Sequence, residues 1–184
     1  MAAREQISMR RSNESTVHQL TLARKQGDAF ATALEEMTRN EAHGRSKLAG
    51  DYLVAVAVED AEGLYAMEDG ELHWHEPVEA NAHIEVVVCD AIDGRFLPGL
   101  DVEVHVKRDS GEPVGSAKHD FLWHPWLYHY GRNWQVDEDG VYTITVRFDA
   151  PRYMRHDRKN GRRFADGAEV TFEGIHITPG QKKS

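Results

Sequence analysis

Hydrophobic and polar residues alternate with a period of two over most of the chain after Asp51. Successive side chains of a β-strand point to opposite faces, so this pattern predicts strands that each bury one face. Turn dipeptides such as Asp69-Gly70 separate the runs. We predict seven strands, at residues 51–59, 63–68, 71–76, 82–90, 101–108, 141–149 and 168–177. Because no helical pattern lies between them, they indicate an all-β fold, an antiparallel β-sandwich of immunoglobulin-like type.

The start of the chain follows a different period. Residues 13–44 lack proline and are rich in Ala, Leu, Glu and Arg. Phe30, Leu34 and Met37 have the i, i+4, i+7 spacing of one helical face. This pattern predicts one helix, or two helices that meet at Gly27. The alternative is a coil that becomes ordered only against a partner or another subunit.

We expect the chain to have two parts. Gly44 is typical of the C-terminal cap of a helix, so the helix is expected to end there. Residues 1–50 then form an N-terminal helical extension, and residues 51–184 form the β-sandwich. A length of 184 residues with 40% apolar content suits one core of ordinary size.

Composition argues against several classes of function. The net charge of −9, without a basic run, speaks against nucleic acid as a partner. The single cysteine, Cys89, excludes an intrachain disulfide and a thiolate metal cage. No stretch approaches the roughly 18 apolar residues of a membrane span, and no apolar leader follows the first arginines. We therefore expect a soluble chain that does not span a membrane and that is, as written, cytoplasmic. Eleven histidines are an unusually large number for this length.

Alternation assigns several of these histidines to a strand face. In residues 82–90 the apolar residues Ile84, Val86 and Val88 share one face, and His83 and Glu85 project side by side from the other. An imidazole and a carboxylate two residues apart can converge on one cation. Such a pair is also common on a solvated strand face, so the pattern alone leaves both interpretations open. Cys89 lies on the same face as His83, where it is either a soft metal ligand or an inert, packed side chain.

The densest aromatic segment is "FLWHPWLYHYGRNW", residues 121–134. Its tryptophans, which are typical of a core or of a partner surface, are Trp123, Trp126 and Trp134. His124 and His129 flank Pro125 in a stretch that Pro and Gly interrupt, so we expect a loop, and loops on a β scaffold often hold binding groups. Tryptophans around imidazoles lower the local dielectric and favour the neutral, metal-ligating form of histidine.

Other histidines give weaker indications. His156 lies in a basic connection, residues 151–163, and is either a ligand or an exposed loop residue. His73 and His75 share one strand face and form a further candidate pair. His105 lies on the polar face of its strand and is expected to be solvated.

Three short motifs occur in an order that resembles a known family. They are His83-x-Glu85, His129-Tyr130-Gly131 and Arg155-His156-Asp157. The ordered set resembles the periplasmic iron-transport accessory family, the Tpd-type divalent-cation-binding proteins, over about residues 51–177. The resemblance implies an immunoglobulin-like sandwich, often a homodimer, that binds copper or iron for a partner permease in the periplasm.

The resemblance also implies a set of ligands and a change in it. The implied ligands are His83, Glu85, His129 and, near a dimer interface, His156. Where the family has Met-Pro-Met, this chain reads "WHPW". Trp126 therefore stands at the position of a ligand methionine, His124 replaces the first methionine, and the family's Asp has no counterpart. Imidazole is a borderline ligand and thioether a soft one, so preference should move from Cu(I) towards Cu(II), Fe, Zn(II) or Ni(II).

The leading hypothesis is a non-enzymatic divalent metal-binding protein that acts in metal uptake or delivery. Copper or iron is the expected metal, with zinc and nickel as alternatives. Nitrogen and oxygen ligands without a separate acid, base or nucleophile suit capture better than turnover. One alternative is a mononuclear metalloenzyme in which Glu85 acts as a base. The other is a β-sandwich interaction module with a helical oligomerisation arm, whose tryptophans bind a partner.

Overall fold

The computed structural model describes residues 9–40 and 42–182. In this part of the chain one helix, α1 (Val17–Asn40), precedes ten strands. The strands are β1 (Ala42–Ala49), β2 (Tyr52–Glu59), β3 (Leu64–Glu68), β4 (Glu71–His75), β5 (Ala82–Asp90), β6 (Val102–Arg108), β7 (Pro113–Leu122), β8 (His129–Trp134), β9 (Gly140–Phe148) and β10 (Ala168–Ile177). Eight of them form one antiparallel sheet in the order β1-β2-β5-β8-β7-β6-β9-β10, and β3 and β4 form a separate two-stranded sheet. All seven strands predicted from alternation are present.

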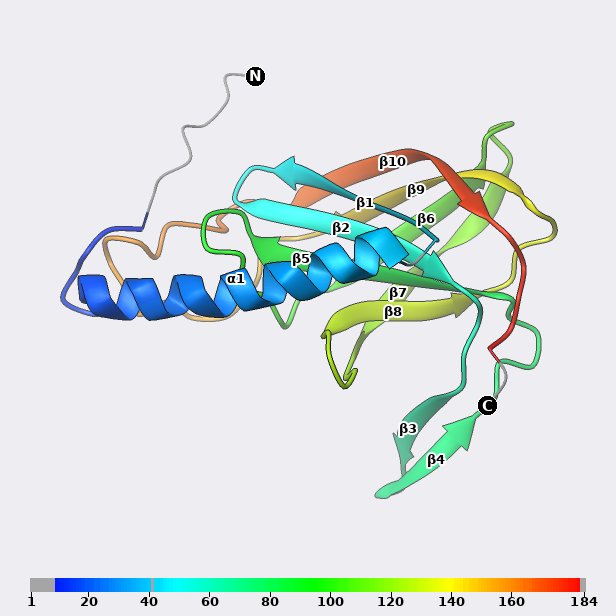
Figure 1. The fold of residues 1–184 in the computed structure, drawn as a ribbon, viewed down its shortest axis with the longest axis horizontal. Coiled ribbons are helices and arrows are strands. Elements are labelled where there is room, and N and C mark those ends of the chain that lie inside the picture. The colour runs from blue at the N-terminus through cyan, green and yellow to red at the C-terminus, as the bar shows by residue number, and fades with distance from the viewer. Residues whose placement is uncertain (1–8, 41, 183–184) are drawn as a thin grey trace.

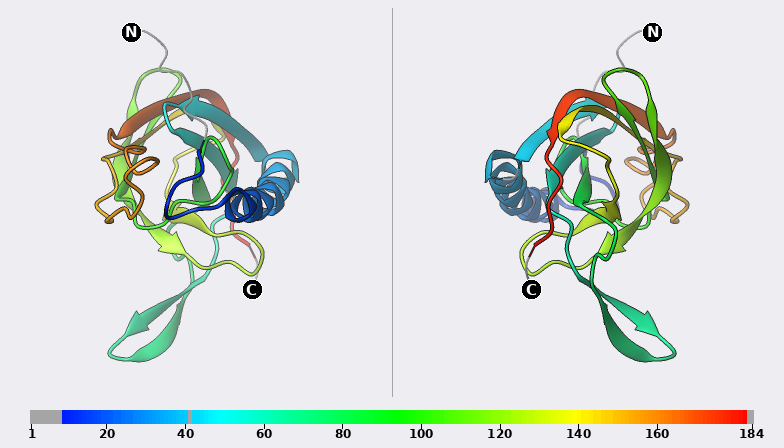
Figure 2. Two further views of the ribbon diagram at one scale, coloured as in Figure 1. Left: turned by 90° about the vertical axis from the view of Figure 1, so that its left-hand side faces the viewer. Right: turned by 90° about the vertical axis from the view of Figure 1, so that its right-hand side faces the viewer.

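The eight-stranded sheet curls until its two edge strands approach each other (Figure 2). Arg45 of β1 donates hydrogen bonds to the carbonyl oxygens of Glu173 and Gly174 in β10, at 2.6 and 2.9 Å. Lys47 donates to the carbonyl oxygen of Thr171, at 2.6 Å. The sheet is therefore nearly closed. The predicted all-β fold with a helical extension is confirmed, while the assignment to an immunoglobulin-like sandwich stays a prediction.

Apolar side chains fill the inside of the curled sheet. In β9 the alternate residues Tyr142, Ile144, Val146 and Phe148 are at most 3% exposed. Three strands, β1, β7 and β8, were not predicted from the sequence. β1 and β7 are rich in polar or exposed residues, and Gly131 and polar residues interrupt β8, so none of them has a clear apolar period. β7 and β8 complete the sheet between β5 and β6.

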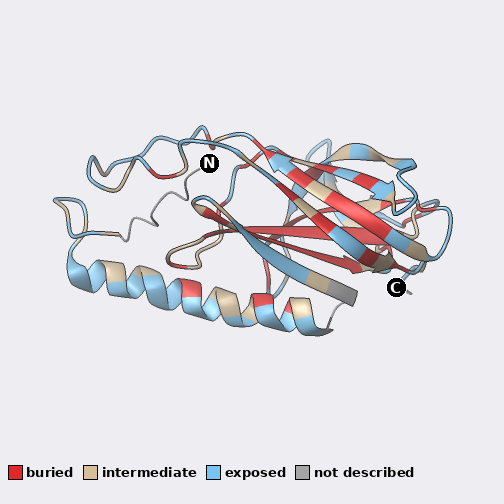
Figure 3. Cartoon of the chain, turned by 90° about the horizontal axis from the view of Figure 1, so that it is seen from above, coloured by how far each residue is buried: buried red, intermediate tan, exposed pale blue. Residues whose placement is uncertain are grey.

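The helix α1 covers the outer face of β2 and β5 (Figures 1 and 3). Thr16 and Gln19 form a capping box, in which each side chain accepts a hydrogen bond from the other residue's backbone amide, at 3.2 and 2.9 Å. Leu34 and Met37, on the predicted apolar face, pack in one cluster with Ala55, Ala57, Val87, Cys89 and Leu127. Within residues 9–40 and 42–182, no helix is both long and apolar enough to cross a bilayer.

The structure decides between the two alternatives for Gly27 and contradicts the prediction for Gly44. Gly27 lies inside one continuous helix, so the single-helix alternative is confirmed. A Cβ added there would fall 1.5 Å from the carbonyl oxygen of Asp93, so the glycine lets the helix approach the turn after β5. Gly44 is not a helix cap, because the helix ends at Asn40 and the chain enters β1. The helix is thus shorter than the 1–50 extension, and the division into two parts stays a prediction.

The hairpin of β3 and β4 projects away from the sheet (Figure 1), and we call residues 60–79 the arm. Its turn has positive φ angles at Asp69 (50°) and Gly70 (88°), as expected for a two-residue hairpin loop. Tyr65 and Trp74 contact each other edge to face, with ring centroids 4.9 Å apart, yet remain 66% and 45% exposed. The arm contains seven carboxylates and no Lys or Arg, in a chain of net charge −9. It is an acidic projection with exposed aromatic side chains.

Candidate metal centre

A group of polar residues lies where β5 pairs with β8. In the register of these strands, His83 is opposite Asn133 and Glu85 is opposite Gly131. His83 and Glu85 lie on one face, as alternation predicted, and this is the outer face of the sheet. Their exposed fractions are 0% and 5%, so the face is buried rather than solvated. Polar groups at such depth require partners or a ligand.

His129 completes this group from the first position of β8. It is 2% exposed, and its Nε2 lies 3.2 Å from Oε1 of Glu85. The rings of His83 and His129 are nearly perpendicular, with centroids 6.0 Å apart. One ligand atom from each of His83, Glu85 and His129 lies within 4.8 Å of the others. This spacing suits one ion bound by two imidazole nitrogens and a carboxylate. We call these three residues the buried cluster.

Hydrogen bonds fix the same tautomer in both histidines. His83 Nδ1 lies 2.9 Å from Oδ1 of Asn133, whose Nδ2 donates to the carbonyl oxygen of Glu62 at 2.7 Å. His129 Nδ1 lies 3.2 Å from the carbonyl oxygen of Leu127. Oxygens of this kind only accept, so both Nδ1 atoms bear the proton. Each Nε2 therefore presents a lone pair, and neither Nε2 has a hydrogen-bond partner among the described residues. Metal-ligating histidines are oriented in this way.

Burial keeps both imidazoles neutral at ordinary pH. Desolvation is the main cause that lowers the pKa of His129 to about 4, and the hydrogen bond to Leu127 opposes it. Desolvation also lowers the pKa of His83, against the opposing charge of Glu62. Two neutral imidazoles with lone pairs aimed near carboxylates repel those oxygens unless a cation lies between them. The electrostatics of the buried cluster thus favour a bound cation.

Gly131 leaves room for such an ion. A Cβ added at this position would lie 2.6 Å from His83 Nε2 and 3.1 Å from Cδ2 of His129. Its backbone lies outside the positive-φ region, so conformational freedom does not explain the glycine. The space that any larger residue would fill adjoins the lone pair of His83.

His124 lies next to the buried cluster but outside it. Its ring centroid is 6.0 Å from that of His129, and Trp126 packs edge to face against it at 5.6 Å. His124 is half-buried, and Trp126 is 44% exposed. The predicted loop spans residues 123–128, but residues 129–134 form β8, so the expectation of a loop over the whole segment is wrong. His129, Gly131 and Asn133 alternate along this strand, which places them on one face.

The tryptophans do not form one surface or one wall. Trp134 is buried in the core, and its indole nitrogen donates to Nε2 of His119 at 3.1 Å. Trp123 is 71% exposed. The three tryptophans therefore do not share one role. The core alternative holds for Trp134, because the alternation of β8 turns it inward, whereas Trp126 packs against His124.

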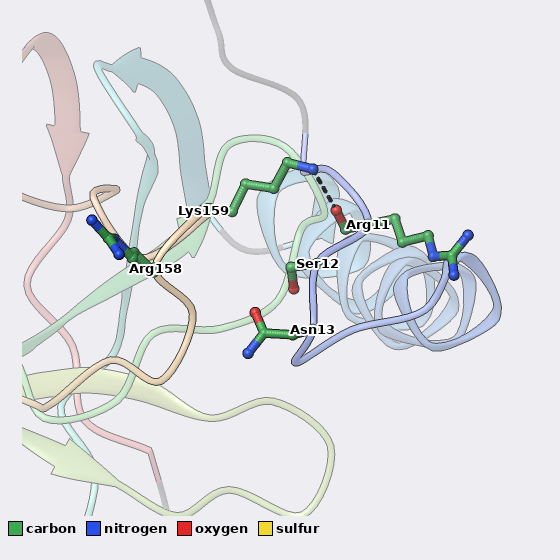
Figure 4. Close-up of a pocket in the computed structure, with 5 residues that line it drawn as sticks. All are labelled: Arg11, Ser12, Asn13, Arg158 and Lys159. Atoms are coloured by element: carbon green, nitrogen blue, oxygen red, sulfur yellow. Dashed lines mark hydrogen bonds between the residues drawn. The ribbon is translucent and has the colours of Figure 1, made fainter.

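His156 lies away from the buried cluster of its own chain. It is exposed in the connection between β9 and β10 and lines a cavity of about 760 Å³ with Phe96, Tyr153 and Arg163. A neighbouring cavity of about 540 Å³ (Figure 4) is lined by Arg11, Ser12, Asn13, Arg158 and Lys159. Lys159 donates to the carbonyl oxygen of Arg11 at 2.8 Å, and Ser12 donates to Asp157 at 2.7 Å. These bonds fasten the segment before α1 to the His156 connection.

The other candidate ligands are exposed to solvent or packed in the protein, away from the buried cluster. His73, His75 and His105 are exposed, and His75 and His105 each lie near a glutamate, Glu68 and Glu103 respectively, at 3.0 and 3.8 Å. Cys89 is packed beneath α1, and burial raises the pKa of its thiol to about 12, so the thiol stays protonated at neutral pH. Such a thiol is a poor metal ligand.

Three residues around the site were not predicted from the sequence. They are Asn133, Glu62 and Gly131, the last of which leaves space beside His83. Asn133 orients His83, and Glu62 Oε1 lies 3.7 Å from Nε2 of His83. The signal for Asn133 was present in the His-x-Gly-x-Asn spacing of residues 129–133, had this stretch been recognised as a strand. Glu62 lies at the base of the arm, before β3, and no local pattern connects it to β5.

Comparisons with known proteins agree with the motifs. A profile of the family described as Fe2+ transport protein matches residues 34–175. No protein with a curated description matches the sequence. The fold is similar to that of FetP from uropathogenic Escherichia coli strain F11, with a TM-score of 0.61 and 18% identity over 74% of this chain and 94% of FetP. It is also similar to copper-reconstituted P19 from Campylobacter jejuni, with a TM-score of 0.59 and 17% identity over 76% of this chain and 96% of P19.

These likenesses concern the fold, because the identities are low. The FetP of that structure was expressed recombinantly in the periplasm, and the cytoplasmic location expected for this chain stays a prediction. The profile match covers most of the chain and includes the positions of the buried cluster. The resemblance inferred from the three motifs is thereby confirmed, and the protein belongs to the Fe2+ transport protein family.

Proposed function

We propose that this protein binds a divalent metal ion, copper or iron, at His83, Glu85 and His129 and acts without catalysis in metal uptake or delivery. One observation supports this most strongly. Two buried imidazoles have their Nδ1 atoms bound to oxygen acceptors and their Nε2 lone pairs directed to the same small space as a carboxylate. All three side chains serve as ligands, which favours capture over turnover.

The choice of metal follows from the ligand atoms and from the relatives. The family is described as transporting Fe2+, and P19 from Campylobacter jejuni has been reconstituted with copper. Imidazole and carboxylate suit Cu(II) and Fe(II), and they also accept Zn(II) and Ni(II). We propose His124, whose ring centroid lies 6.0 Å from that of His129, as an additional nitrogen ligand. A thioether would favour Cu(I), so its replacement by His124 supports a preference for divalent ions.

We further propose that the protein is a homodimer in which His156 of one copy approaches the buried cluster of the other. Within one chain His156 lies in a separate, basic connection, and residues 151–163 contain six Lys or Arg and one carboxylate. The arm, which begins beside His83, is acidic. Opposite charges on these two surfaces would steer two copies together. In this proposal a partner permease receives the metal.

Calorimetric titration of metal-free protein with Cu(II) and, without oxygen, with Fe(II) tests the proposal. We expect about one ion per chain, bound by wild type and lost in His83→Ala and His129→Ala. His105→Ala is the matched control, because it removes an exposed histidine from another strand. Analytical ultracentrifugation of wild type and of His156→Ala tests the dimer. Equal binding by all variants would refute the assignment of the buried cluster.

A further inference from the structure

The C-terminal segment of the described chain is fastened to the base of the arm. The amide of Ala61 donates to the carbonyl oxygen of Gly180 at 2.9 Å, and the amide of Lys182 donates to the carbonyl oxygen of Ala61 at 2.8 Å. On the other side of the arm, Gln181 Nε2 donates to the carbonyl oxygen of Pro77 at 2.6 Å. Residues 180–182 therefore hold both ends of the arm together.

Glu62 lies between this segment and the buried cluster. Its backbone amide donates to Oδ1 of Asn133 at 3.3 Å, and its carbonyl oxygen accepts from Nδ2 of Asn133 at 2.7 Å. Asn133 is the residue that orients His83, so His83 and the backbone of Glu62 share one support. The Glu62 carboxylate is 19% exposed and places Oε1 3.7 Å from Nε2 of His83. Glu62 is thus held beside the lone pair of a proposed ligand.

The distance between these two atoms fits two ligands of one ion. With metal–ligand bonds of 2.0–2.1 Å and tetrahedral angles, ligand atoms lie roughly 3.3 Å apart. The observed 3.7 Å is close to this value, and Glu62 has only to turn its side chain slightly to reach an ion on His83. Buried sites with two nitrogens and one carboxylate commonly take a fourth ligand.

Lys182 occupies the other oxygen of Glu62. Its ammonium lies 3.0 Å from Oε2 of Glu62 and also pairs with Glu59. The Lys182 ammonium is a cation on a carboxylate that faces the cluster. A metal ion on His83 and the Lys182 ammonium therefore compete for the negative charge of Glu62. If both bind this carboxylate, the two cations lie close together and repel each other.

We propose that Glu62 is a fourth, exchangeable ligand of the proposed metal site and that Lys182 on the C-terminal segment competes with the metal for it. The inference rests on the proposed function, because it assigns an ion to the buried cluster. Metal binding then draws Glu62 from Lys182 and loosens the C-terminal segment from the arm. Conversely, a partner that engages Lys182 frees Glu62 for the metal, so the segment regulates loading.

Titration of the metal-free full chain with Cu(II) tests this with four variants. Glu62→Gln keeps the shape and loses the charge, so we expect affinity to fall roughly tenfold, the effect typical of residues around a metal site. Lys182→Gln removes the competitor, so we expect affinity to rise roughly threefold, in line with the energy of an exposed ion pair. In the double variant, Lys182→Gln should have no further effect. Glu71→Gln, at the tip of the arm, removes the same charge away from His83 and should bind as wild type does.

The outcomes separate this inference from the proposed function. If wild type and Glu71→Gln bind copper while Glu62→Gln binds equally well, the role of Glu62 is refuted and the buried cluster stands. If Lys182→Gln tightens binding equally with and without Glu62, Lys182 acts by general charge and the competition is refuted. If wild type binds no metal, the proposed function itself fails. Denaturant unfolding of each variant checks that the fold is retained.

Discussion

Gly131→Ala should close the metal site with one added carbon. The substitution leaves His83, Glu85 and His129 in place and adds a Cβ 2.6 Å from Nε2 of His83. A metal ion on this nitrogen would lie 2.0–2.1 Å away. The added methyl group and the metal ion would therefore overlap, so both cannot be present beside His83. His83 cannot retreat easily, because Asn133 holds its other nitrogen.

The magnitude follows from these contacts. A carbon at 2.6 Å from a ring nitrogen and from Cδ1 of Leu122 overpacks the site, which costs about 1–3 kcal/mol of unfolding free energy. Displacing His83 or the ion should cost about 100-fold in metal affinity, or roughly 2.7 kcal/mol. Wild type should gain stability from added metal by mass action, whereas Gly131→Ala should gain almost none.

The assay is calorimetric titration together with thermal unfolding in the presence and absence of Cu(II). Gly115→Ala in β7 is the matched control, because its Cβ would lie 3.7 Å from the Trp134 ring, an ordinary contact. We expect the control to bind metal as wild type does. If folded Gly131→Ala retains the wild-type affinity, the ion does not occupy the space between His83 and His129, and our reasoning is refuted.

Three further predictions concern support of the site and stability. Asn133→Ala should weaken metal binding about 10–100-fold while the chain stays folded, because His83 loses its orienting partner; equal affinity would contradict this. Arg163→Met should cost about 3–5 kcal/mol of unfolding free energy in urea titrations, because it leaves Asp90 buried without the cation that donates to it; an unchanged midpoint would contradict it. Burial lowers the pKa of His119 to about 3, so the unfolded chain takes up a proton at this residue as the pH falls below 6.5, while the folded chain does not. The unfolding free energy of metal-free protein should therefore fall by about 1.4 kcal/mol per pH unit, owing to this residue, down to about pH 3. Urea titrations at several pH values should show that His119→Gln removes this part of the pH dependence, and an unchanged pH dependence would contradict it.

Much of the fold follows from local patterns in the sequence. The strand β9 has clear alternation, and in β5 the face shared by His83 and Glu85 follows from their spacing alone. β7 was missed because its polar residues face solvent and give no apolar signal. The arm was visible as two strands around Asp69-Gly70, but its projection from the sheet depends on strand pairing that no local pattern encodes.

The site was predicted in part, for the same reasons. His129 was a candidate from the motif, yet its approach to Glu85 at 3.2 Å depends on β8 being a strand paired with β5. Glu62 lies 21 positions before His83 in the sequence, and only the fold brings them together. His156 stays a predicted ligand that requires a second copy of the chain.

The most direct test of the metal site is the state of the imidazole nitrogens, measured by long-range ¹H–¹⁵N NMR on metal-free protein and after one equivalent of diamagnetic Zn(II). We predict that metal-free His83 and His129 both show the Nδ1–H tautomer, and that zinc shifts the Nε2 signals of these two residues while that of exposed His105 stays in place. Protonated Nε2 atoms in the metal-free protein, or zinc-induced shifts confined to other histidines, would contradict the account.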